Sequence, residues 1–201
     1  MAVTPERFSQ GITYDAYKAQ MTRNRDRLDL AESGFTPNPA DLAAFRRLPK
    51  TFNVVAIAED WCGDVIANLP IVGRLAQESG KLNLRIFLRD QNLDLIDQYL
   101  KEGKYRSIPV FVFFDESFNE IGHFIERPAS VTELRARKRA EVFAKNPEFG
   151  SPDAPPDQLP EDVRARLNQA LTASREETTP FANAEVVREL RAIVERVPVG
   201  G

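Results

Sequence analysis

The stretch Phe52–Pro70, FNVVAIAEDWCGDVIANLP, places the only cysteine of this chain between an apolar run and a helix-like segment. Its first seven residues are continuously apolar and rich in valine and isoleucine, which is typical of a strand covered on both faces. Cys62 follows after a three-residue turn, so we expect it at the first turn of a helix that runs to about Ser79 and ends at Gly80. Unpaired backbone N–H groups and the positive end of the helix dipole favour a thiolate at that place.

Cys62 is therefore the candidate catalytic residue. Cysteines at helix N-termini can have pKa values lowered to about 3.5–7.5, and the thiolate is the form that reacts. We expect Cys62 to be accessible and its pKa to lie below that of a free thiol, although the acids Asp60 and Asp64 oppose the shift. The alternative is an inert cysteine packed as a small hydrophobic residue, and the polar neighbours Glu59, Asp60 and Asp64 make such a buried setting awkward.

Outward from this stretch, the patterns predict an α/β fold with the order β-α-β-α-β-β-α. A crossover between the first two strands makes them parallel and a tight hairpin makes the last two antiparallel, so the sheet should be mixed. A serine followed three residues later by glutamate, in Ser130–Glu133, resembles a capping box at the start of the last helix. The further strands are expected at 82–88, 109–114 and 120–125, and the further helices at 93–100 and 130–144.

Helical segments flank this predicted core. We divide the chain into an N-terminal helical extension (1–50), a core (51–146), and a proline-rich linker with C-terminal helices (147–201). Helices are expected to start near Thr4 and Asn38 and to cover 14–31, 161–174 and 183–197. Their apolar stripes should pack against the core; these residues are Tyr14, Tyr17, Leu42, Phe45, Leu167, Leu171, Val187, Leu190 and Val194.

Composition narrows the class of protein. The 201 residues carry a net charge of −3 with both signs interspersed, which favours neither nucleic acid nor an anionic membrane as a partner. No apolar run approaches the about 20 residues that span a bilayer, and we expect no secretory signal in MAVTPERFSQ. One cysteine cannot form an internal disulfide, which fits a reducing, cytoplasmic location.

The motif Trp61-Cys62-Gly63-Asp64 resembles the W-C-G-P-C signature of thioredoxins, and more closely the W-C-G-D-C variant of some bacterial thioredoxin-like proteins. Pro70 stands where thioredoxins carry the proline of the active-site helix. Ser107-Ile108-Pro109 precedes a strand, where the family has its cis-proline. The resemblance covers about 51–146 and implies a thioredoxin-like fold with a cis bond between Ile108 and Pro109.

Two positions depart from the family pattern. Val65 occupies the place of the second, resolving cysteine. Ala56 occupies the place of a buried aspartate that, in thioredoxins, helps to deprotonate that second cysteine through water. The two losses are consistent, because the aspartate has no role once the second cysteine is absent. The ordinary dithiol cycle therefore cannot run in this chain.

The resemblance implies a single-cysteine thiol-disulfide oxidoreductase in which Cys62 forms a mixed disulfide. The substrate would be a protein or small-molecule disulfide, and a low-molecular-weight thiol or protein reductant would resolve the intermediate. The implied substrate-binding residues are Trp61, Gly63, Ile108 and Pro109. We expect no cofactor and no metal, because a lone His123 beside one cysteine is too little for a metal site. The alternative is a redox-inactive thioredoxin-fold binding or scaffold module, with the helical extensions as its working surfaces.

Overall fold

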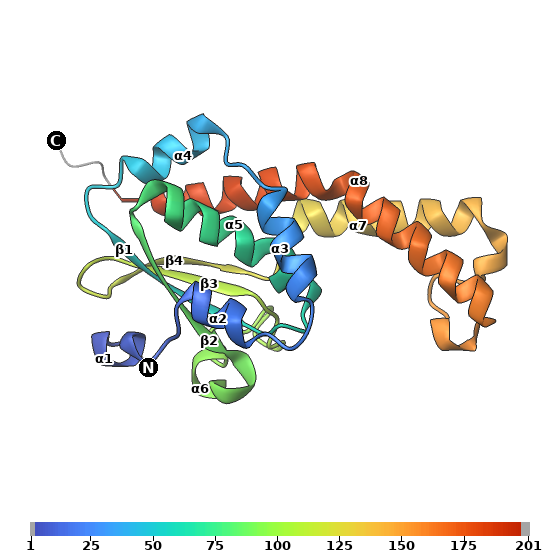
Figure 1. Ribbon diagram of the computed structural model, residues 1–201, viewed down its shortest axis with the longest axis horizontal. Helices are drawn as coiled ribbons and strands as arrows, with labels where there is room; N and C mark the ends of the chain where they lie inside the picture. The colour runs from blue at the N-terminus through green and yellow to red at the C-terminus, as the bar shows by residue number, and fades with distance from the viewer. Residues whose placement is uncertain (1–2, 198–201) are drawn as a thin grey trace. The chain divides into compact units, whose positions relative to one another are not determined.

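A mixed four-stranded sheet is the centre of the computed structural model, which describes residues 3–197 (Figure 1). The strands are β1 (Phe52–Ala58), β2 (Leu82–Leu88), β3 (Val110–Phe114) and β4 (Glu120–Ile125), in the order β2-β1-β3-β4. β1 runs parallel to β2 and antiparallel to β3, and β3 runs antiparallel to β4. This arrangement confirms the α/β order and the mixed sheet that the sequence predicts.

The two central strands are almost entirely buried. Every residue of β3 is buried, and in β1 only Asn53 is partly accessible. Val, Ile and Phe side chains suit such positions because branched and aromatic groups pack well on a pleated surface. The continuous apolar runs of the sequence are therefore explained by burial on both faces of these strands.

Helix α5 (Gly63–Ser79) carries the residues that follow β1. Cys62 is its N-cap, and Gly80 ends it in the left-handed conformation with φ of 64°. Two helices from the N-terminal part, α3 (Arg25–Ser33) and α4 (Pro39–Arg46), pack against α5 (Figure 1). A further close approach involves Gly73, where a Cβ atom would lie 2.7 Å from the Tyr14 ring, so this position needs glycine.

The N-terminal helices differ from the predicted continuous helix over 14–31. The chain forms α1 (Pro5–Ser9), then α2 (Tyr14–Gln20), and begins again at α3. At the break, the Asp60 carboxylate accepts hydrogen bonds from the backbone N–H groups of Thr22 (2.7 Å) and Arg23 (3.0 Å). These N–H groups are therefore not available for the hydrogen bonds of a continuous helix. A contact with a residue distant in sequence thus ends the helix here.

The helix expected over 93–100 is shorter than predicted. A 3-10 segment, Arg89–Gln91, leads into α6 (Leu93–Ile96), and turns follow up to the cis-proline. Leu95 and Ile96 are buried, as the apolar pattern requires, while Leu93 is 43% exposed.

The chain divides into two compact units, residues 1–127 with 186–201, and residues 128–185. The second unit contains α7 (Ala129–Lys145) and the first part of α8 (Glu161–Val194). Its own apolar cluster is formed by Phe143, Phe149 and Leu167, with Leu171 packed beside them. Leu167 and Leu171 therefore do not join the main core, and that part of the prediction is wrong.

The last part of α8 belongs to the first unit. Val186, Val187, Leu190, Ile193 and Val194 are buried in the main core. Ile193 lies directly over β4, where a Cβ atom on Gly122 would be 3.2 Å from it. The predicted stripe residues Tyr17, Leu42, Phe45, Val187, Leu190 and Val194 are buried in this core, with Tyr14 packed against it.

Two helix boundaries differ from the sequence prediction. Ser130 is not a cap, because α7 begins at Ala129 with Pro128 as its N-cap, and the Ser130 hydroxyl bonds to the Glu185 carboxylate instead. The two helices expected over 161–174 and 183–197 are one helix, α8, with Pro180 inside it. Among the described residues, no helix is both long and apolar enough to cross a membrane.

Candidate functional site

Cys62 lies where a buried strand gives way to the first turn of α5. Its backbone is extended, with φ of −85° and ψ of 120°, and its N–H donates to the Glu59 carbonyl at 3.2 Å. The side chain is half-buried and packs against the main core. The sequence places this cysteine correctly at a helix N-terminus.

The Ile108–Pro109 segment faces the Cys62 sulfur. The peptide bond between Ile108 and Pro109 is cis, as the resemblance implies. The Cys62 thiol lies 3.4 Å from the Ile108 carbonyl oxygen, in position to donate a hydrogen bond to it. The structure thus brings Cys62 next to Ile108 and Pro109, which lie 46 and 47 residues later in the sequence.

The electrostatics of the sulfur differ from the expectation. Burial raises the pKa of the Cys62 thiol above its ordinary value, and the Asp64 and Glu126 carboxylates raise this pKa further. Backbone N–H groups of Val65 and Asp64 oppose the shift but do not overcome it. The predicted pKa below that of a free thiol is therefore wrong, because desolvation exceeds the effect of the helix N-terminus. At neutral pH the sulfur is a thiol.

Trp61 and Gly63 flank the sulfur on the chain. Trp61 is 41% exposed, and the Arg89 guanidinium lies over its ring at 4.7 Å from the centroid. This is a cation–π contact, which holds the ring at the surface beside Cys62. Gly63 is the first residue of α5.

An ion-pair network that the sequence patterns do not predict lies beside the sulfur. Arg127 pairs with Asp64 at 3.1 Å and also with Glu126, and Lys101 pairs with Glu126 at 2.6 Å. Burial opposes ionisation of Glu126, but the two cations overcome it and lower the pKa of that carboxyl. Asp64 is thus an ion-pair partner with a side chain only 16% exposed.

The loop that supplies this network is fixed next to the cis-proline. The Glu126 N–H donates to the Pro109 carbonyl at 2.7 Å, and the buried Asn68 amide of α5 donates to the Glu126 carbonyl at 2.8 Å. Glu126 adopts a left-handed backbone with φ of 62°. The only sequence signal for this site is the charged pair Glu126-Arg127 directly after β4.

The two departures from the thioredoxin pattern are both fully buried. Val65 lies in the first turn of α5 and Ala56 in the middle of β1, each with no exposed surface. Ala56 pairs in register with Ile86 and Phe111, so its surroundings are apolar. Within residues 3–197, no group of three or more His, Cys, Asp or Glu side chains could hold a metal ion.

Comparison with known proteins places this site in a family. A family model described as thioredoxin matches residues 11–140, well over half of the chain. No curated protein matches. A crystal structure of a protein of unknown function from Pseudomonas aeruginosa is similar, with 21% identity and a TM-score of 0.66 over 97% of this chain and 98% of that one. An HIV epitope-scaffold is also similar, with 17% identity and a TM-score of 0.66 over 98% of this chain and 100% of the other. The two structures agree in fold, and on the strength of the family match this chain belongs to the thioredoxin family.

Proposed function

We propose that this protein is a single-cysteine thiol-disulfide oxidoreductase that works through a mixed disulfide at Cys62. The observation that carries the proposal is the position of the Cys62 sulfur, at the N-terminus of α5 and 3.4 Å from the Ile108 carbonyl oxygen. Because the sulfur is only half-buried, a partner can reach it. Its thiolate can accept hydrogen bonds from the backbone N–H groups of Asp64 and Val65.

The reaction requires one external thiol per turnover. The Cys62 thiolate attacks one sulfur of a substrate disulfide R–S–S–R′, forming Cys62–S–S–R and releasing R′–S⁻, which takes up the proton that Cys62 lost. An external thiol R″–SH, after losing its proton, then attacks the sulfur of R as a thiolate, so that the disulfide R″–S–S–R leaves and the Cys62 thiolate is released, which takes up that proton or starts the next cycle after the proton passes to solvent. Since Val65 supplies no second thiol, the chain itself cannot resolve the intermediate.

The edge next to the sulfur suits an extended partner chain. In the free protein the Ile108 carbonyl lies against the thiol, and among the described residues the Ile108 N–H has no hydrogen-bond partner. Once Cys62 is deprotonated or bound in a mixed disulfide, it no longer donates to that carbonyl. A backbone segment of the substrate could then pair with both polar groups of Ile108.

The raised pKa of Cys62 sets the pH range of this activity. Because the thiol form dominates at neutral pH, attack on a disulfide should be slow there and faster at alkaline pH. A substrate that displaces the carboxylates or brings a positive charge to the sulfur would lower that pKa.

The test compares the folded protein with its own unfolded chain. Incubation with hydroxyethyl disulfide, followed by mass measurement, gives the rate of mixed-disulfide formation at each pH, and the same chain in urea gives the rate of an unstructured thiol. Addition of a reduced external thiol should then release the adduct, and Cys62→Ser should form none. A native rate that stays far below the urea rate up to pH 10 would contradict the proposal.

The second candidate is a redox-inactive binding module of the same fold. Two features support it: burial raises the pKa of the Cys62 thiol, and Val65 and Ala56 are fully buried in apolar surroundings. For such a module, we expect the native rate with hydroxyethyl disulfide to stay far below the urea rate up to pH 10.

A further inference from the structure

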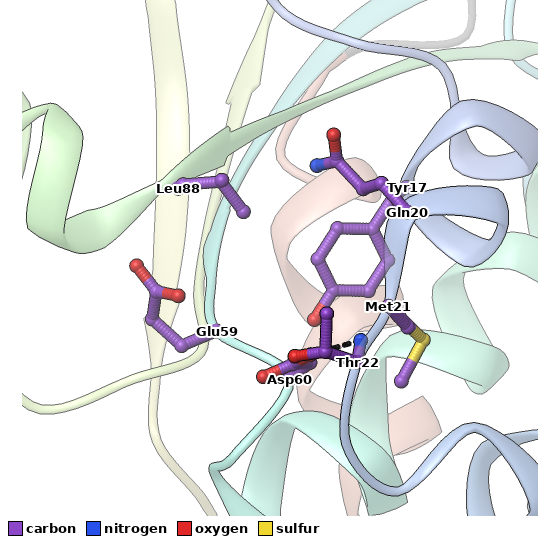
Figure 2. A pocket seen from close by; sticks show the side chains of 7 residues that line it. All are labelled: Tyr17, Gln20, Met21, Thr22, Glu59, Asp60 and Leu88. Atoms are coloured by element: carbon purple, nitrogen blue, oxygen red, sulfur yellow. Dashed lines mark hydrogen bonds between the residues drawn. The ribbon is translucent and has the colours of Figure 1, made fainter.

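A pocket lies next to the site motif. Its lining includes Asp60, the residue directly before Trp61. It has a volume of about 270 Å³ and is formed where the parallel strands β1 and β2 end (Figure 2). In open α/β sheets, ligands bind beyond the carboxyl ends of parallel strands. The volume is below the about 300–1,000 Å³ of clefts for drug-sized ligands, so it suits a single side chain. Its lining residues are Tyr17, Gln20, Met21, Thr22, Glu59, Asp60 and Leu88.

A buried hydroxyl without a partner contributes to this pocket. Tyr17 is only 1% exposed, and in the described part of the chain its hydroxyl makes no hydrogen bond. Figure 2 shows the ring entering beside Met21, with the hydroxyl directed toward the Asp60 end of the pocket. Buried polar groups are nearly always paired, so this hydroxyl calls for a partner that the protein itself does not supply.

Two carboxylates give the pocket its charge. One oxygen of Glu59 accepts the Asp90 N–H at 2.9 Å, and Oδ2 of Asp60 accepts the N–H groups of the segment after α2. The other oxygen of each carboxylate, Glu59 Oε2 and Asp60 Oδ1, accepts no hydrogen bond from any described residue. These two oxygens remain available to a donor.

The neighbouring cation Arg89 and the hydrogen bond from the Asp90 N–H lower the pKa of Glu59, but they do not outweigh the effects that raise it. Arg89 is paired with Asp90 at 2.7 Å and lies over the Trp61 ring. Burial raises the pKa of Glu59, and the neighbouring carboxylates of Asp90 and Asp60 add to the increase. A cation in the pocket would favour the ionised form of Glu59 and relieve this repulsion.

We propose that this pocket binds the guanidinium group of an arginine side chain on the disulfide-bearing polypeptide that reacts with Cys62. A guanidinium presents five N–H donors in a plane, which matches two free carboxylate oxygens and the Tyr17 hydroxyl better than a single ammonium does. The apolar stem of the arginine would lie against Leu88 and Met21. Binding of the guanidinium stands on the pocket alone, and its role in substrate choice rests on the proposed function.

The binding test uses the full chain with Cys62→Ser, so that no thiol chemistry contributes. Nα-acetyl-arginine methylamide is titrated by calorimetry against the citrulline analogue, which has the same shape and no charge. We expect saturable binding of the arginine probe and at least tenfold weaker binding of the citrulline probe. Equal binding of the two probes, or no binding of either at millimolar concentration, would overturn the proposal.

Variants locate the binding in the pocket. Glu59→Gln and Tyr17→Phe, which each preserve shape, should weaken the arginine probe at least fivefold, while the matched control Glu116→Gln in the β3–β4 turn should not. Thermal melts verify that each variant is folded. Binding that survives Glu59→Gln unchanged would place the probe elsewhere and refute the assignment.

A second experiment separates this proposal from the proposed function. The wild-type chain reacts with peptides whose single cysteine is held as a disulfide and whose flanking residue is arginine, lysine or citrulline. We expect the arginine peptide to react at least fivefold faster than the citrulline peptide, with lysine between them. Equal rates from all three peptides overturn the substrate-choice role and leave the thiol chemistry intact. A probe that binds to a protein whose Cys62 never reacts refutes the oxidoreductase and leaves the guanidinium pocket standing.

Discussion

Replacing Val65 by cysteine should create an internal disulfide with Cys62. Cys62 is the N-cap of α5 and Val65 lies three residues later, with its side chain fully buried under the first turn. Residues three apart on a helix have Cβ atoms about 5–6 Å apart, and a disulfide needs about 3.5–4.5 Å. The extended backbone of Cys62 allows that adjustment without unwinding the helix.

The expected size of the effect follows from the length of the closed loop. Residues 62–65 form a four-residue loop, for which the chain-entropy relation gives a stabilisation of about 2 kcal/mol at 25 °C. Exchange of a fully buried valine for the smaller cysteine costs on the order of 1 kcal/mol in either redox state. The reduced variant should therefore be about 1 kcal/mol less stable than the wild type, and the oxidised variant about 1 kcal/mol more stable.

Urea unfolding of both redox forms measures these differences. Mass spectrometry of the oxidised variant should show the loss of two hydrogens, and the double variant Cys62→Ser, Val65→Cys provides the control that cannot close the loop. Two persistently free thiols after mild oxidation would refute the described geometry of the first turn of α5. An oxidised form less stable than the reduced form would refute the stabilisation expected from closing the four-residue loop.

Four further outcomes follow from the site. Alkylation of Cys62 by iodoacetamide should have a pH midpoint above the ordinary value of about 8.5, and a midpoint below it would contradict the desolvation argument. Because the folded pKa of Cys62 is raised, the unfolded chain loses the thiol proton first, so the free energy of unfolding should fall as the pH rises from about 8.5 to about 9.5. Cys62→Ser should abolish the fall in that range in pH-dependent urea titrations, whereas the buried tyrosines, whose pKa values are also raised, act at higher pH. Arg127→Gln leaves Asp64 and Glu126 without their shared cation, so alkylation at pH 8 should slow further, with Arg127→Lys retaining part of the wild-type rate. Asn68→Ala removes the amide that bonds to the Glu126 carbonyl and should lower the free energy of unfolding by about 1–2 kcal/mol, measured in urea.

The strands and the position of the cysteine could be predicted because their signals are local. FNVVAIA and VFVFF are apolar without interruption, and both strands are buried on both faces as such runs require. The N-cap position of Cys62 follows from the short turn after β1. The cis bond between Ile108 and Pro109, and the place of these residues in the same site as Cys62, follow only from the family resemblance, since no local pattern joins them to the cysteine.

The features that could not be predicted depend on contacts distant in sequence. The break after α2 exists because Asp60 takes the backbone N–H groups of Thr22 and Arg23, which no helical periodicity reveals. The direction of the Cys62 pKa shift depends on how much of the sulfur is buried, and burial is a property of the packed fold. Arg127 reaches Asp64 only because the loop after β4 is fixed beside Pro109.

The return of α8 to the first unit sets the timing of folding during synthesis. The sheet is complete in sequence at Ile125, but the helical segment that lies over β4 at Gly122 begins only at Val186. At a translation rate of about 5–20 residues per second, the 72 residues from 126 to 197 take about 4–14 s to make. During that interval α8 does not yet cover the face of β4 around Gly122. The nascent chain therefore exposes an apolar surface to chaperones and other nascent chains. A message truncated before codon 186 would leave that surface open permanently, so its product should be recovered with chaperones or in aggregates.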